Sequence, residues 1–158
     1  MEPSEWMHRF KITHEQAKAG KLKEAEHKAY LDMREELARS LIAAQSLQVP
    51  KGEFSRKHFR VAQMYKLEIA NTYQSMTRQV SVKGFSANLQ AQFKVGQELD
   101  FALHVQRETD PITGKAKVVS VQKQGALHLV SFSIEHMSEA SSERLETVLF
   151  DAVLSRFR

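Results

Sequence analysis

The sequence predicts an α+β fold that is mainly β: an N-terminal helical region, a six-stranded antiparallel β-barrel and a C-terminal helix. Apolar residues recur at steps of three and four through residues 21–47, which is typical of one amphipathic helix. Residues 64–134 hold six short segments rich in β-branched and aromatic residues, separated by turn residues. A stretch rich in capping residues then opens a second helical pattern over residues 138–157.

Length and composition limit how many domains this pattern contains. The chain has 158 residues, of which 42% are hydrophobic and 27% charged, the balance of a globular protein with one main core. We expect the chain to divide after Pro50, because a proline there ends the helical pattern. The predicted domains are therefore an N-terminal helical extension over 1–50 and a barrel domain with its C-terminal helix over 51–158.

Several classes of site are excluded by what the chain lacks. It has no cysteine, which rules out disulfides and thiolate metal sites, and its seven histidines lack metal-ligand spacing. We therefore expect no metal and no cofactor. The sequence has neither an apolar run of about 20 residues nor a signal-peptide pattern at its start, so we expect a cytoplasmic protein without membrane association.

The net charge of +4 lies entirely in the second part of the chain. Residues 1–50 carry eight basic and eight acidic side chains, whereas residues 51–158 carry fifteen basic and eleven acidic ones. This excess suits a local anion site but is small for binding along DNA or RNA, so no nucleic acid partner is expected. We find no set of nucleophile, base and oxyanion donors, and expect the protein not to be an enzyme.

The helical extension contains two candidate helices. Trp6 and Phe10 mark a short first helix that Gly20 interrupts. The second helix begins near Lys21 and ends before Pro50. Its predicted apolar stripe consists of Leu22, Ala25, Ala29, Met33, Leu37, Leu41, Ala44 and Leu47. A helix cannot bury such a stripe alone. We therefore expect either that the two helices form a hairpin or that the long helix pairs with a second copy of itself in a homo-oligomer.

The six predicted strands alternate apolar and polar residues over short distances. They span residues 64–70, 74–82, 84–90, 98–107, 115–122 and 127–134. Asp110 to Gly114 is predicted to be a turn. Six strands at this spacing favour a closed barrel, because closure removes exposed strand edges.

The C-terminal helix is predicted from caps and periodicity. Ser138 to Ser142 is rich in residues that cap helix N-termini, and Glu139 places negative charge in the first turn. Apolar side chains follow at helical spacing: Leu145, Val148, Leu149, Ala152, Val153 and Phe157. We expect this helix to pack on the barrel and close one of its openings.

A basic segment joins the helical and β-rich parts. Arg56 and Arg60 lie four residues apart in Phe54 to Val61, just after the break formed by Pro50 and Gly52. On a helix the two arginines would only share an exposed face. The upstream break favours an extended or loosely coiled segment, on which they present two guanidinium groups to an anion. Phe54 and Phe59 are expected to anchor the segment by packing.

Together with Gln79-Val80-Ser81-Val82-Lys83-Gly84 and the order of strands, this segment resembles the PilZ domain family over roughly Phe54 to Leu154. The resemblance implies a six-stranded antiparallel barrel that binds cyclic di-GMP, a bacterial second messenger. The family motifs are Arg-x-x-x-Arg and Asp/Asn-x-Ser-x-x-Gly. The implied ligand-binding residues are Arg56, Arg60, Gln79, Ser81 and Gly84.

The chemistry of these residues suits a flat dianion. Arginine pairs bidentately with phosphate or with guanine, and Ser81 has a hydroxyl to donate. Gly84 either takes a positive φ at a turn or lets the backbone approach the ligand. Gln79 departs from the family pattern, and a neutral, longer side chain there weakens binding by about ten- to thirty-fold, or roughly 1–2 kcal/mol.

Two functions follow from this resemblance. The first is a non-enzymatic cyclic di-GMP receptor in which the nucleotide orders the linker, Phe54 to Val61, between helices and barrel and signals to a downstream protein partner. The alternative is a degenerate PilZ-like adaptor that binds a protein partner and not the nucleotide. Gln79 is the residue that separates these two interpretations.

Overall fold

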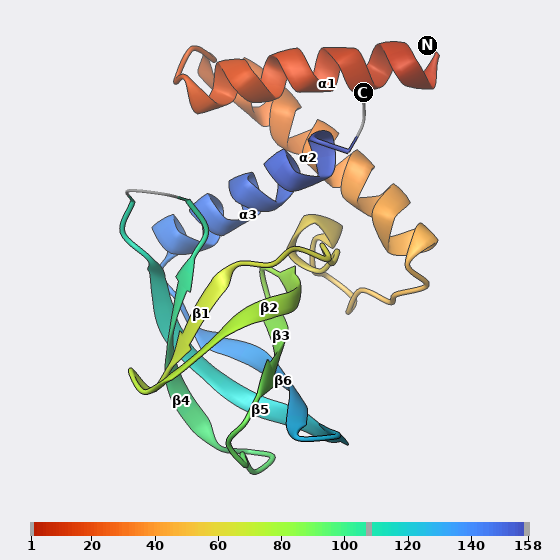
Figure 1. Cartoon of the computed structure of the whole chain (residues 1–158). Coiled ribbons are helices and arrows are strands. Elements are labelled where there is room, and N and C mark those ends of the chain that lie inside the picture. Colours follow the sequence, from red (N-terminus) through yellow and green to blue (C-terminus); the bar gives the residue numbers. More distant parts are fainter. Residues whose placement is uncertain (1, 107–108, 157–158) are drawn as a thin grey trace. The chain divides into compact units, whose positions relative to one another are not determined.

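The computed structural model describes residues 2–106 and 109–156, and divides into two compact units. The first unit, Met1–Arg56, is helical, and the second, Lys57–Arg158, contains the β-strands and the last helix. Figure 1 labels the helices and strands in chain order.

The helical unit is a hairpin of α1 (Pro3–Lys18) and α2 (Glu24–Ala44). Gly20 lies in the connecting turn with φ +71°, a conformation that favours glycine. The backbone N–H of Lys23 donates to the Glu26 carboxylate at 3.0 Å, which caps the start of α2. The hairpin predicted from the sequence is confirmed.

The inner face of this hairpin is more polar than the predicted apolar stripe. Phe10 and Tyr30 are fully buried with their ring centroids 5.9 Å apart. The Tyr30 hydroxyl forms two hydrogen bonds with buried side chains. One is shared with Nδ1 of His14, and the other is donated by Nε of Arg34 at 2.8 Å. The tyrosine hydroxyl therefore satisfies two buried side chains that would otherwise be costly to bury.

The predicted stripe on α2 is accordingly wrong in part. Leu37 is buried as expected, but Ala25, Ala29 and Ala44 are exposed. Hydropathy counts tyrosine and arginine as surface residues, so it cannot foresee a buried pair whose polar atoms bond to each other. The prediction also extended α2 too far, since Ser46 adopts φ +55° and the helix has ended by then.

The second unit contains a closed barrel of six strands, as predicted (Figure 1). Every neighbouring pair is antiparallel, and pairing of the first strand with the fourth closes the ring. The order around the barrel is β1, β2, β3, β6, β5, β4. The strands are β1 (Lys66–Ile69), β2 (Tyr73–Ser81), β3 (Gly84–Leu89), β4 (Glu98–His104), β5 (Ile112–Gln124) and β6 (Leu127–His136).

One predicted turn is partly a strand. β5 begins at Ile112, and Gly114 pairs with Phe101 of β4 instead of turning the chain. A side chain at Gly114 would place its Cβ 2.2 Å from the carbonyl oxygen of His136, so this glycine permits a close approach of two strands. The predicted strand ended at Arg107, which lies outside the described residues.

The C-terminal helix α3 (Glu139–Leu154) lies over one end of the barrel (Figure 1), as expected. The Ser138 hydroxyl accepts a hydrogen bond from the Ser141 N–H at 3.0 Å, which caps the helix. Leu145 and Leu149 are fully buried. The predicted contribution of Phe157 lies outside the described residues.

Candidate functional site

The basic segment is fixed against the barrel by a pair of backbone hydrogen bonds. The N–H of Val61 donates to the carbonyl of Val80 at 2.8 Å, and the N–H of Val80 donates back at 2.9 Å. This bridge is antiparallel, so Arg60 lies level with Ser81. Arg60 and Ser81, which lie 21 positions apart in the two halves of the predicted motif, are thereby neighbours.

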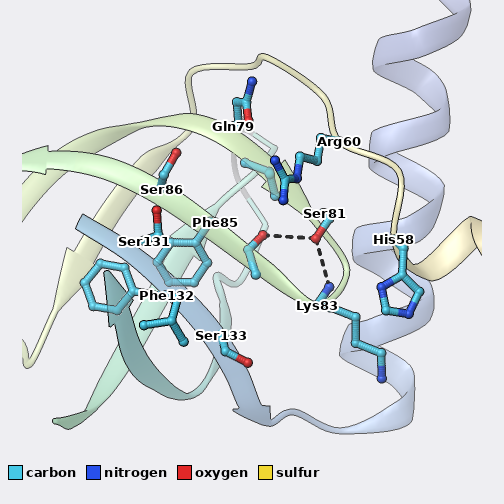
Figure 2. A pocket seen from close by; sticks show the side chains of 13 residues that line it. His58, Arg60, Gln79, Ser81, Lys83, Phe85, Ser86, Ser131, Phe132 and Ser133 are labelled. Atoms are coloured by element: carbon cyan, nitrogen blue, oxygen red, sulfur yellow. Dashed lines mark hydrogen bonds between the residues drawn. The ribbon is translucent and has the colours of Figure 1, made fainter. Parts of the chain in front are cut away.

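A cavity of about 270 Å³ lies at this junction (Figure 2). It brings together four of the five predicted ligand-binding residues: Arg60, Gln79, Ser81 and Gly84. Side chains from the linker, β2, β3 and β6 surround it in Figure 2. The other lining residues are His58, Val80, Lys83, Phe85, Ser86, Val119, Ser131, Phe132 and Ser133.

The lining of this cavity is basic and polar. Arg60 and Lys83 carry positive charge, and His58 adds an imidazole. Among the described residues that line it, none is aspartate or glutamate. Hydroxyl groups come from β2, β3 and β6. A concave site with this composition suits an anion that also has hydrogen-bonding groups.

Ser81 shapes the turn between β2 and β3. Its hydroxyl donates to the carbonyl of Gly84 at 3.3 Å and accepts from the N–H of Lys83 at 3.2 Å. Figure 2 draws both bonds as dashed lines. The hydroxyl proton of Ser81 is thus engaged within the turn, while one lone pair of its oxygen can still accept a hydrogen bond. The bond from the Lys83 N–H fixes the backbone of Lys83 at the edge of the cavity.

Gly84 has a packing role that the sequence did not suggest. Its φ is not positive, so it is not the turn glycine that was one expectation. It pairs with Ser133 of β6, and a Cβ at this position would lie 2.4 Å from the carbonyl oxygen of Phe132. Only glycine lets β3 and β6 approach this closely beneath the cavity.

Gln79 follows a β-bulge. The register between β2 and β3 shifts between Thr77 and Gln79, so Arg78 is the extra residue. Thr77 is buried, and its hydroxyl donates to the Gln63 carbonyl at 2.7 Å. The bulge leaves Arg78 and Gln79 exposed in succession, and it aims Gln79 at the cavity.

Arg56 is placed differently from Arg60. It is the last residue of the helical unit, and its N–H donates to the carboxylate of Glu35 on α2 at 3.0 Å. Its guanidinium lies 4.0 Å from the centre of the Phe54 ring. Phe54 is 53% exposed, so its predicted role as a packing anchor is wrong. Arg56 is not one of the residues that line the cavity.

Sequence reasoning missed some of the lining residues. His58 and Lys83 stand inside the two motifs, and their position there was a usable signal. Ser86 of β3 and Ser131 and Ser133 of β6 carried no such signal. They reach the cavity because Gly84 pairs with Ser133 and Ser86 pairs with Ser131, a register that only the folded barrel reveals.

Two further features concern metal binding and membrane insertion. Within residues 2–106 and 109–156, no three histidine, aspartate or glutamate side chains gather where they could hold a metal ion. Across those same residues, no helix has both the length and the apolar character needed to cross a bilayer.

The sequence family is decided by a match over most of the barrel unit. The model of the PilZ domain matches residues 54–151, which include the basic segment, all six strands and most of α3. The chain belongs to the PilZ domain family. The match begins at Phe54, where the PilZ motif segment starts, so the helical hairpin lies outside it. No curated protein sequence matches the chain.

Solved structures support the PilZ fold. The Bacillus subtilis inhibitor of motility, MotI/DgrA, superposes with a TM-score of 0.56 at 14% identity, covering 61% of this chain and 50% of that one. Escherichia coli YcgR in complex with c-di-GMP gives 0.52 at 16% identity, covering 62% and 46%. The PilZ domain of YcgR with c-di-GMP gives 0.50 at 15%, covering 62% and 91%. The chain spans about half the length of the first two proteins.

Proposed function

We propose that this PilZ protein is a non-enzymatic receptor for cyclic di-GMP. The observation that carries the proposal is the bridge between Val61 and Val80, because it joins the two motif halves around one basic cavity. Membership of the PilZ family and the c-di-GMP in the YcgR structures support the same ligand.

Each side chain of the cavity has a defined role in this proposal. Arg60 pairs with a phosphate or with the O6 and N7 atoms of a guanine, which its planar guanidinium matches bidentately. Lys83 neutralises phosphate as a point charge, and the Ser81 hydroxyl keeps Lys83 in place. Gln79 meets the edge of a base.

The two arginines of the motif belong to different compact units. We propose that nucleotide binding is signalled through the linker at this boundary. The boundary falls between Arg56 and Lys57. Arg56 is bonded to α2 through Glu35, while Lys57 is bonded to α3 through Glu146. A nucleotide bound at Arg60 further restrains the linker, Phe54 to Val61, and a downstream protein partner recognises the change.

Calorimetric titration of the full chain with cyclic di-GMP tests the proposal. We expect saturable binding in the micromolar range or tighter that is lost in Arg60→Ala and reduced in Arg56→Ala. Lys123→Met is the matched control, since Lys123 is an exposed cation near the β5–β6 turn and does not line the cavity. Well-folded wild-type protein that gives no heat rejects the proposal.

A second function is favoured by one observation, the glutamine at position 79. In this alternative the chain is a PilZ-like adaptor that binds a protein partner and has lost the nucleotide. Gln79→Asp separates the two functions. A receptor gains about ten- to thirty-fold in affinity over a wild type that already binds, because the glutamine costs one charge-assisted hydrogen bond. An adaptor binds cyclic di-GMP only after the substitution.

A further inference from the structure

Alternate residues of the basic segment have opposite partners in the barrel unit. His58 and Arg60 line the cavity. Lys57 and Phe59 instead contact α3: Lys57 Nζ lies 2.5 Å from Glu146 Oε2, and the ring centroids of Phe59 and Phe150 are 4.8 Å apart. The segment is therefore held by α3 through one set of side chains and presents the other set to the cavity.

The contacts with α3 are buried. The Glu146 side chain is fully buried, and the Lys57 side chain is 25% exposed. Phe59 and Phe150 are both fully buried. The segment is not extended throughout, as the sequence had suggested, because Ser55–Lys57 form a single 3-10 turn and His58 lies in the turn that follows. With an anchor on each side of His58, this segment has little freedom to move His58 or Arg60.

Stability alone is a weak reason for this ion pair. Burying a carboxylate costs several kcal/mol, and pairing it with an ammonium group often only offsets that cost. An apolar residue at position 146 would be at least as stabilising if packing were its purpose. What the charge pair adds is a directional contact that fixes where the backbone of Lys57 lies.

We propose that Lys57, Glu146 and Phe59 are positioning residues for nucleotide binding, which fasten the basic segment to α3 so that His58 and Arg60 face the cavity. This inference rests on the proposed function. It makes α3 part of the binding apparatus although none of its residues lines the cavity.

Glu146→Gln distinguishes positioning from simple electrostatics. Removing a negative charge from the barrel unit favours an anionic ligand by Coulomb attraction alone, so electrostatics predicts unchanged or tighter binding. Positioning predicts weaker binding, by about tenfold, because the contact that fixes Lys57 is lost. The two explanations thus differ in the sign of the effect.

Glu146→Asp distinguishes pairing from packing. Glutamine keeps the shape of glutamate and loses its charge, whereas aspartate keeps the charge and loses one methylene. If Glu146 acts through the ion pair with Lys57, Glu146→Asp retains more affinity than Glu146→Gln. If Glu146 only fills space on α3, the order is reversed.

The experiment is calorimetric titration with cyclic di-GMP of the wild type, both Glu146 variants, Phe59→Leu and Lys18→Met. Thermal unfolding without nucleotide identifies the variants that fold. Phe59→Leu changes no charge and keeps an apolar side chain, and we expect it to weaken binding by about threefold to tenfold. Lys18→Met removes a lysine from an ion pair on α1, 3.0 Å from Glu15, and is expected to bind as the wild type does.

Weaker binding in folded Glu146→Gln, together with the order aspartate above glutamine, supports the proposal. Binding that is equal to wild type or tighter in folded Glu146→Gln overturns it. If neither Glu146 variant folds, Phe59→Leu decides, and wild-type affinity in that variant overturns it. If the wild-type chain does not bind the nucleotide, the proposed function fails together with this inference. If the wild type binds and folded Glu146→Gln binds as well or better, only the positioning role fails.

Discussion

At the scale of single residues, Gly84 joins the motif to the barrel. Its place in the motif suggested a contact with ligand, but its surroundings explain it by packing, since a Cβ would overlap the Phe132 carbonyl oxygen at 2.4 Å. The motif glycine is thus a requirement of β3 pairing with β6, on which the floor of the cavity depends.

Gly84→Ala is expected to lower the free energy of unfolding by about 1–3 kcal/mol, because the backbone of β3 or β6 must shift to accept the methyl group. Denaturant unfolding measures this effect. Ser86→Ala, two residues along the same strand, is the control and should change the free energy by less. Equal stability of Gly84→Ala and the wild type would contradict the close approach.

Tyr65 is expected to make the free energy of unfolding depend on pH in the alkaline range. Burial raises the pKa of its hydroxyl from 10.0 to about 12, with a further rise from Asp151 that Arg156 partly offsets. The raised pKa means that the unfolded chain loses this proton first, so stability from Tyr65 is complete below pH 10 and lost as pH rises to 12.

The free energy of unfolding is therefore expected to fall between pH 10 and 12 by up to about 2–3 kcal/mol through this residue. Denaturant unfolding of the wild type and Tyr65→Phe at several pH values isolates the effect, because lysines titrate alike in both proteins. Parallel pH profiles for the two proteins would show that Tyr65 does not contribute.

At the scale of elements, periodicity predicted strands better than it predicted the buried face of a helix. Leu67 and Ile69 on β1 and Leu103 on β4 are fully buried. Phe101 on β4 is nearly so, as alternation requires, since successive strand residues point to opposite faces. On α2, Tyr30 and Arg34 are buried through a shared hydrogen bond that no hydropathy pattern contains.

The residues of the candidate site were likewise predicted only in part. Arg60, Gln79, Ser81 and Gly84 were predicted from motif spacing, and the cavity contains all four. Ser131 and Ser133 were not, because they enter through the register of β3 with β6. A motif identifies residues close in sequence, whereas partners from a distant strand depend on pairing that the local sequence does not encode.

The attachment of the basic segment to α3 predicts a response in that helix. With saturating cyclic di-GMP, amide hydrogen exchange in residues 145–154 should slow, because a ligand on His58 and Arg60 restrains the segment that Lys57 and Phe59 hold against the helix. Residues 122–128, at the β5–β6 turn, are the internal control. Slowing confined to the cavity, with α3 unchanged, would contradict the coupling.

At the scale of the whole molecule, a PilZ barrel unit follows a helical hairpin that the family match does not include. The barrel unit contains the cavity and α3, and the boundary between units divides the two arginines of the motif. The cavity at which we propose nucleotide binding therefore lies within the barrel unit, and Arg56 belongs to the helical unit.

The central claim is that cyclic di-GMP binds in the cavity between the basic segment and β2. An NMR titration of the ¹⁵N-labelled chain tests it directly, since each backbone amide reports separately. Binding there predicts saturable shifts at Arg60, Ser81, Lys83 and Gly84, and little change at Gly125, which does not line the cavity. A folded chain whose cavity amides do not move at saturating nucleotide, or whose shifts lie only elsewhere, would contradict it.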